Sequence, residues 1–146
     1  MTTFVPPYAV TVVSTAGDMS RCTYVDGNGQ PLPPGTVLTT TTSPGEPGAL
    51  EINFTEAVVD GKSLRLVGAA VKTVGNDPTM NPYNYLPATR AAQGETWVDG
   101  IVVPWGVGMY TLRGLVLLFA QVNDNGDMIN FLPSSDPQTQ NDELTC

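Results

Sequence analysis

Histidine is absent from this chain of 146 residues, and basic residues are scarce, with 6 lysines and arginines against 14 aspartates and glutamates. Without histidine, no Ser-His-Asp triad or Cys-His dyad is possible, and the commonest zinc ligand is missing. A formal charge of −8 argues against nucleic acid, because phosphate binding requires clustered lysine and arginine. The longest apolar run, residues 115–122, is far shorter than the about 20 residues of a membrane helix. We therefore expect neither nucleic acid nor a membrane as a partner.

Charged residues are few, and the length suits one domain. They make up 14% of the chain, against an average of about 25%. A domain of this size buries roughly 68–70% of its unfolded surface, so its core needs neither cross-links nor a metal. Residues 1–18 contain no basic segment followed by a long apolar stretch, which is the pattern of a secretory signal. We therefore expect synthesis in a cytoplasm.

Alternation of apolar and polar residues with a period of two dominates the chain and is typical of half-buried strands. In the best example, Leu50, Ile52 and Phe54 share one face and polar residues share the other. Such segments are separated by Gly, Pro, Asn and Asp, which favour turns. The expected strands are residues 8–14, 21–25, 36–42, 50–55, 63–74, 95–103, 109–122 and 128–132. The pattern predicts an all-β fold, a single-domain β-sandwich or jelly-roll-like barrel of about seven to eight strands.

Four local features refine this prediction. Residues 109–122 are apolar on both faces, so we place this strand at the centre of a sheet, covered on both sides. Gly68 indicates a bulge or a close backbone approach. Asn125-Gly126 predicts a type I′ hairpin turn. Residues 76–94 contain three prolines and predict a long loop, with a short helical turn at 88–93, that is functional or pinned against something.

The two ends of the chain differ from the body, residues 8–132. Residues 1–7 predict an extended N-terminal arm, which Pro6 and Pro7 stiffen. Residues 133–146 form an acidic, polar tail, which we expect to be disordered alone or to become ordered on a partner. Two extended ends on a compact β-body favour a protein that packs on other subunits.

Cys22 and Cys146 are the two thiols. We expect both to be unpaired, with Cys22 buried in a strand, because Cys146 lies in the polar tail and cytoplasmic synthesis disfavours oxidation. An intermolecular disulfide through Cys146 is the alternative.

Carboxylates and oxygen-rich turns are the remaining candidates for chemistry. The carboxylates considered are Glu51, Glu56, Asp60, Glu95 and Asp99. A glycosidase needs two carboxyl groups at a fixed separation, and no spacing here indicates such a pair, so solvated surface is the favoured interpretation. Residues 26–29 and 123–127 lack the spacing of an EF-hand loop, and hairpin turns use the same residue types. The sequence therefore predicts no catalytic residue, no metal and no cofactor, with a small glycoside-active enzyme as a minor alternative.

Aromatic residues and the N-terminal arm are candidates for contact with a partner. The candidate interface residues are Phe4, Val5, Pro6, Pro7, Tyr83, Tyr85, Trp97 and Trp105. The four tyrosines and tryptophans in this set are also candidates for an aromatic sugar platform. For Trp105, an interface or core position is favoured over a ligand platform.

The segment 63–74, SLRLVGAAVKTV, combines an arginine among aliphatic residues with a middle of small residues. It resembles a strand of jelly-roll virion proteins, and the short acidic chain, rich in Thr, Pro and Gly, is similar to the capsid decoration (cement) proteins of tailed bacteriophages. The resemblance implies a non-enzymatic virion structural protein, made in the host cytoplasm, that binds between major capsid protein subunits on the capsid surface, often as a trimer. Residues 1–18 lack the basic arm of a coat protein that packages RNA, which favours an outer-surface role.

The main alternative function is a carbohydrate-binding or adhesin-like β-sandwich module that uses Trp97 and Trp105. Quenching of tryptophan fluorescence by glycans would favour it, whereas co-sedimentation with empty phage heads would favour the decoration protein.

Overall fold

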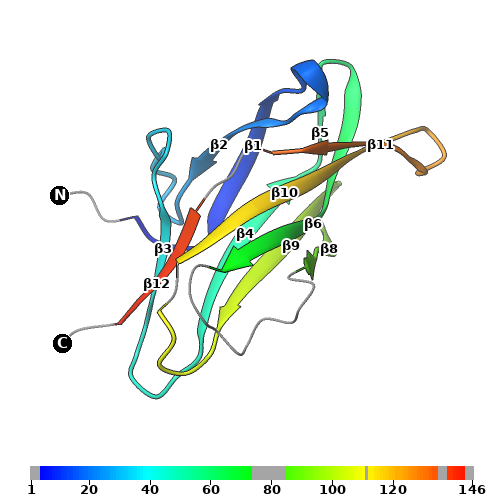
Figure 1. The fold of residues 1–146 in the computed structure, drawn as a ribbon. Helices are drawn as coiled ribbons and strands as arrows, with labels where there is room; N and C mark the ends of the chain where they lie inside the picture. Colours follow the sequence, from blue (N-terminus) through cyan, green and yellow to red (C-terminus); the bar gives the residue numbers. More distant parts are fainter. Residues whose placement is uncertain (1–3, 74–84, 111, 135–137, 144–146) are drawn as a thin grey trace.

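Two curled β-sheets pack face to face in the computed structural model, which describes residues 4–73, 85–110, 112–134 and 138–143 (Figure 1). The five-stranded sheet has the order β2 (Arg21–Val25), β1 (Tyr8–Ser14), β4 (Gly48–Thr55), β9 (Thr96–Trp105) and β8 (Thr89–Gln93). The seven-stranded sheet has the order β3 (Leu38–Thr42), β12 (Gln138–Glu143), β10 (Leu112–Val122), β6 (Lys62–Thr73) and β5 (Ala57–Val59), with β11 (Met128–Pro133) beside β10 and β7 (Tyr85–Pro87) beside β6. The predicted all-β sandwich is confirmed, but the expected number of strands was too low.

The core lies between the two sheets and follows the predicted alternation. Along β4, Leu50, Ile52 and Phe54 are buried, while the residues between them point outward. Phe54 meets Phe119 of β10 edge to face, with ring centroids 5.0 Å apart. Edge-to-face packing of this kind joins the two sheets through aromatic contact in addition to apolar burial.

Strands β6 and β10 form the centre of the seven-stranded sheet, as predicted for residues 109–122 (Figure 1). Their register shifts by one residue beside Gly68, which confirms the predicted irregularity. A Cβ atom at Gly68 would lie 2.8 Å from the carbonyl oxygen of Leu86 and would overlap the hydroxyl of Tyr85. The expectation that this strand is covered on both sides is wrong. Only its inner face is fully covered, and most outward residues of β10 are half-buried.

At two corners a strand continues from one sheet into the other with a single residue between, which gives the sandwich a barrel-like form. β4 continues through Glu56 into β5, and β7 continues through Ala88 into β8. At each corner the intervening N–H is bonded: Glu56 donates to the carbonyl of Trp97 at 2.9 Å, and Ala88 donates to the carbonyl of Val67 at 3.0 Å. The predicted loop and helical turn are therefore wrong for residues 85–93, which form strands; residues 76–84 lie outside the described residues.

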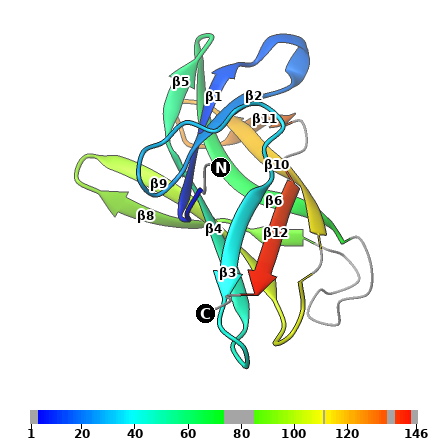
Figure 2. The same cartoon turned by 90° about the vertical axis from the view of Figure 1, so that its left-hand side faces the viewer.

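The polar C-terminal segment belongs to the sandwich. β12 lies between β3 and β10, parallel to β3 and antiparallel to β10 (Figure 2). Before it, Ser134 is buried, and its N–H donates to the carbonyl of Leu117 at 2.8 Å. The expectation of a tail that is disordered alone is wrong for residues 138–143, because ladder hydrogen bonds hold β12 without a contribution from apolar side chains.

The described part of the N-terminal segment packs on its own body. Val5 donates its N–H to Oδ2 of Asp26 at 3.1 Å, and its carbonyl accepts the N–H of Gly27 at 2.7 Å. Phe4 packs against the hydrophobic core. The prediction of an arm available to other subunits is therefore wrong for Phe4 and Val5, whose contacts are made within the chain.

The turn between β10 and β11 differs from its predicted type, which is found instead between β5 and β6. Asp60 and Gly61, between β5 and β6, both have positive φ, at 51° and 75°, as a type I′ turn requires. In the β10–β11 loop only Gly126 has positive φ, and its N–H donates to the carbonyl of Asn123. The predicted hairpin is confirmed there, but its predicted type I′ turn is wrong, because that turn needs two residues with positive φ.

Candidate functional site: the outer face of the seven-stranded sheet

The outward side of the seven-stranded sheet carries apolar residues in neighbouring positions on several strands. Arg65 of β6, Ala120 of β10 and Phe131 of β11 form one row across the sheet, since they pair directly in the register. Gly68, Leu118 and Pro133 form the next row, and Ser63, Val122 and Met128 form the row on the other side. Val58 pairs with Ser63, and Tyr85 pairs with Ala70 next to Gly68. We call Val58, Tyr85, Leu118, Val122, Met128 and Phe131, with Arg65 among them, the outer apolar face.

This face is open to solvent at several large side chains. Val58 is 70% exposed and Phe131 is 52% exposed, and Tyr85 and Met128 are also exposed. Ile129, next to Phe131 on the short strand β11, is exposed as well. Single exposed apolar residues are common, but a contiguous group over several strands marks an interaction surface.

Arg65 is the one basic side chain of the central row. Its residue is half-buried, and its Nε is buried with no hydrogen-bond partner. Within the described residues, the guanidinium forms no ion pair, in contrast to Arg90. A cation that is partly desolvated and has no counter-ion raises the free energy of the isolated chain. Pairing with a carboxylate of another molecule would lower that free energy.

The outward side of the five-stranded sheet has the opposite character. Thr11 pairs with Thr23, and Asn53 lies opposite Gly100, which is followed across the sheet by Thr89. Glu51 is exposed on the same side, as predicted for solvated surface. Val13 and Val102 are exposed there too, but polar neighbours separate them. This sheet therefore presents an ordinary hydrated surface.

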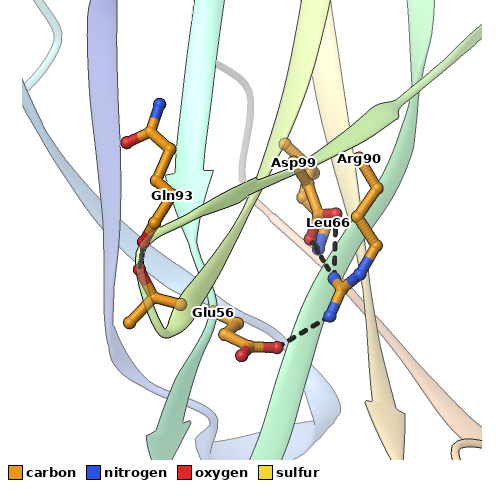
Figure 3. Close-up of polar contacts among 6 residues, drawn as sticks. Glu56, Leu66, Arg90, Gln93 and Asp99 are labelled. Carbon is orange, nitrogen blue, oxygen red and sulfur yellow. Dashed lines mark hydrogen bonds and ion pairs between the residues drawn. The ribbon is translucent and has the colours of Figure 1, made fainter.

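A charged cluster holds the two sheets together near the corners (Figure 3). The Arg90 guanidinium of β8 lies between two carboxylates, 2.8 Å from Oε2 of Glu56 and 3.0 Å from Oδ1 of Asp99. Asp99 of β9 is fully buried, and its Oδ2 accepts the N–H of Leu66 from β6 at 3.1 Å. Asp99 thus binds both sheets at once, which is a structural role for a buried carboxylate.

The same cluster bears on the glycosidase alternative. Two of the candidate carboxylates, Glu56 and Asp99, are bonded to the Arg90 guanidinium. A glycosidase needs two carboxyl groups that flank the scissile bond of a substrate, whereas these two flank the guanidinium of Arg90. In this structure Glu56 and Asp99 therefore have a structural role, since they hold the Arg90 side chain between them.

The predicted aromatic contacts are dispersed. Trp105 is 1% exposed in the core, where the Arg113 guanidinium lies 5.2 Å from its ring centroid. Of the two positions predicted for Trp105, the core is therefore confirmed and the interface is wrong. Trp97 is 43% exposed at the charged corner, with the Arg90 guanidinium 4.8 Å from its ring centroid. Tyr85 lies in the outer apolar face, and Tyr83 lies outside the described residues. A platform that combines the two tryptophans does not exist in this fold.

In the oxygen-rich turns, side-chain oxygens accept hydrogen bonds from nearby backbone N–H groups. Oδ1 of Asp26 accepts the N–H groups of Asn28 and Gln30, and Oδ1 of Asn123 accepts those of Asn125 and Asp127. Burial raises the pKa of Asp26, but bonds from the backbone of Gln30, Val5 and Asn28 outweigh it and hold that pKa below its usual value. Among the described residues, no group of three or more metal-ligating side chains comes together.

Cys22 is a free thiol on β2, half-buried against the core, and burial raises its pKa to about 12. A thiol with so high a pKa is almost entirely protonated at neutral pH and a poor nucleophile. Cys146, the predicted site of an intermolecular disulfide, lies outside the described residues.

The residues of the outer apolar face, apart from Tyr85, were missed by the sequence-based list of interface residues. Residues 128–132 do contain a signal, since Met128, Ile129, Phe131 and Leu132 leave no consistently polar face. The other members come from strands far apart in the sequence and meet only through the register.

Within the described residues, no helix is long or apolar enough to cross a membrane.

Comparisons of the chain with protein-family models and with curated proteins find no match.

Proposed function

We propose that this chain is a structural protein of a virus particle, which decorates and stabilises a capsid by docking between major capsid protein subunits. The observation that supports the proposal most strongly is the outer apolar face, which lies on one side of a sandwich whose opposite side is polar. A body of this kind binds with one surface and leaves the other in water. That is the geometry that a decoration protein on a shell requires.

The size of the face fits the centre of a protein–protein interface. Four strands about 4.8 Å apart, with three rows about 7 Å apart, give a footprint on the order of 300–400 Å². A standard interface buries about 800 Å² on each partner, with an apolar core and a polar rim that carries much of the area. Binding as a trimer would add avidity, because each subunit engages an equivalent site on the same shell.

The rigidity of the body supports the same function. Asp99 of β9 binds the N–H of Leu66 in the other sheet, and Ser20 links the β1–β2 connection to β11 through hydrogen bonds to Leu132 and Pro133. A rigid surface loses little conformational entropy on docking, so more of the apolar burial contributes to affinity. The carbohydrate-binding alternative has weaker support, since Trp105 is buried and Trp97 stands alone at its corner.

The test is co-sedimentation of the purified chain with empty heads of the phage that encodes it. The variant Val58→Ser/Phe131→Ser removes two exposed apolar side chains from the outer apolar face, whereas Val13→Ser/Val102→Ser removes two of similar exposure from the other sheet. We expect the first variant to lose at least about tenfold in affinity and the second to bind as the parent chain does. Equal binding by both variants would refute docking through this face, and no binding by the parent chain would refute the capsid function.

A further inference from the structure

We infer that Arg65 determines the specificity of the outer apolar face, which accepts a surface of another protein that presents a carboxylate inside an apolar patch. This inference rests on the proposed function, because it names the chemistry of the partner at the same face. The partner would bring an aspartate or glutamate to Arg65 and apolar side chains to Phe131 and Leu118.

The position of Arg65 makes it the centre of the face. It lies in the row with Ala120 and Phe131, between the row that contains Leu118 and the row that contains Val122. Ala120 beside it is fully buried, which shows that side chains on this side of the sheet already lie over the backbone there. A surface that covers both Val58 on β5 and Phe131 on β11 must cross β6 and β10 between them, and so it lies over Arg65.

Covering Arg65 has an electrostatic consequence. Its Nε is already without a hydrogen-bond partner, and a docked apolar surface would remove the remaining water from the guanidinium. A buried charge without a counter-ion is strongly unfavourable, whereas a carboxylate pairs with guanidinium through two parallel hydrogen bonds. Purely apolar surfaces are thus rejected, and surfaces with a correctly placed carboxylate are accepted, which is how an interface achieves specificity.

The rim of the face argues against a second copy of this chain as the occupant. Asp124 and Asp127 are exposed in the loop between β10 and β11, directly beside Val122 and Met128. Two copies that met through this face would each add these carboxylates to an interface between chains that both carry a formal charge of −8. Like charges across an interface disfavour association. The complementary partner has a carboxylate in its centre and basic residues at its rim, which is the reverse of the pattern on this chain.

The experiment measures binding of two fluorescent peptides by anisotropy. Both alternate leucine and threonine and end in a lysine pair; one has a central aspartate and the other has asparagine at that position. We expect the aspartate peptide to bind the parent chain about tenfold more tightly, and Arg65→Gln to abolish the difference. Lys72→Gln is the matched control, because Lys72 is an exposed cation farther along the same strand. It should retain the full preference.

Arg65→Lys separates charge from geometry, since lysine cannot form the paired bonds of a guanidinium, and it should retain only part of the preference. Equal binding of the two peptides, no binding of either, or an unchanged preference in Arg65→Gln would overturn the inference. Sedimentation equilibrium provides a further decisive result: a parent chain that self-associates and an Arg65→Gln variant that does not would make a second copy the occupant. If Arg65→Gln binds empty heads as the parent does while Val58→Ser/Phe131→Ser does not, only the role of Arg65 fails.

Discussion

The outer faces of the two sheets belong to strands that share one core, yet they carry different side chains. On the five-stranded sheet, Thr11, Thr23 and Thr89 point outward beside Glu51 and Asn53. On the seven-stranded sheet, the corresponding positions hold Val58, Leu118, Val122, Met128 and Phe131. A sandwich needs only its inner faces to be apolar in order to fold. The apolar outer face therefore requires a reason other than folding.

The burial of the central strand β10 indicates why the two outer faces differ. Strands that are apolar on both faces are typical of sheets that are covered on both sides. Here β10 has a fully buried inner face and half-buried apolar residues on its outer face. The chain itself thus covers only the inner face of β10. A protein docked as we propose would cover the outer face.

The largest expected effect is a loss of stability from breaking the contact by which Asp99 joins the two sheets. Asp99→Asn removes the buried partner of Arg90 and weakens the acceptor for the N–H of Leu66. Loss of one partner of a buried ion pair costs about 3–5 kcal/mol, and we expect the lower figure because Arg90 keeps Glu56. Urea unfolding measures the change.

Glu56→Gln is the control for Asp99→Asn. Its side chain is 35% exposed, and partly exposed ion pairs contribute about 1 kcal/mol or less. A loss from Glu56→Gln as large as that from Asp99→Asn would mean that the corner is held by charge alone, without the link to Leu66.

The next effect tests how tightly the outer apolar face is packed. In Gly68→Ala, the new Cβ would meet the carbonyl oxygen of Leu86 at 2.8 Å and overlap the Tyr85 hydroxyl. Since the backbone of β7 must shift, we expect about 2 kcal/mol of destabilisation, within the usual range for overpacking. Gly114→Ala is the control, because its nearest neighbour would be 4.0 Å away, and it should change the stability by no more than about 0.5 kcal/mol. Equal effects of the two substitutions would show that β7 is free to move.

The matching substitution on the polar face should be milder. In Gly100→Ala, the Cβ would lie 2.8 Å from Oδ1 of Asn53, which is the end of a side chain and not backbone. Rotation of Asn53 relieves the contact, so we expect a loss of about 0.5–1 kcal/mol. Adding Asn53→Ala should restore the stability in a double-mutant cycle measured by urea unfolding. A loss that persists in the double variant would locate the strain in the backbone of β9.

Sequence patterns predicted the parts of this fold that depend on local burial. The alternation in residues 50–55, the central position of residues 109–122 and the irregularity at Gly68 each follow from side chains within one strand. β12 was missed because residues 138–143 contain no apolar side chain, and its place comes from backbone pairing with β3 and β10. Local patterns do not record such pairing.

The candidate site was mostly missed for a related reason. Alternation assigns each strand one buried face, and it treats an apolar residue on the other face as an isolated exception. Val58, Arg65 and Phe131 become neighbours only through the register of β5, β6, β10 and β11. Trp105 was included among the interface candidates as a large aromatic residue, and the inner face of β9 places it in the core. Spatial grouping across strands is thus the information that the sequence pattern lacks.

The smallest expected effect compares one carboxylate from each sheet in acid. The N–H and hydroxyl of Thr15, aided by the charge of Lys62, hold the pKa of Asp60 below its usual value, as the backbone bonds do for Asp26. Because both pKa values are lower in the folded chain, the unfolded chain takes up protons first, so this stability is present above about pH 4 and is lost as the pH falls further. Thermal unfolding across this range should show a flatter acid limb for Asp26→Asn and for Asp60→Asn than for the parent chain. If both variants keep the parent's slope, the bonds of the native carboxylates contribute nothing to stability. If only one variant becomes flatter, only that carboxylate's hydrogen bonds contribute to the loss of stability in acid.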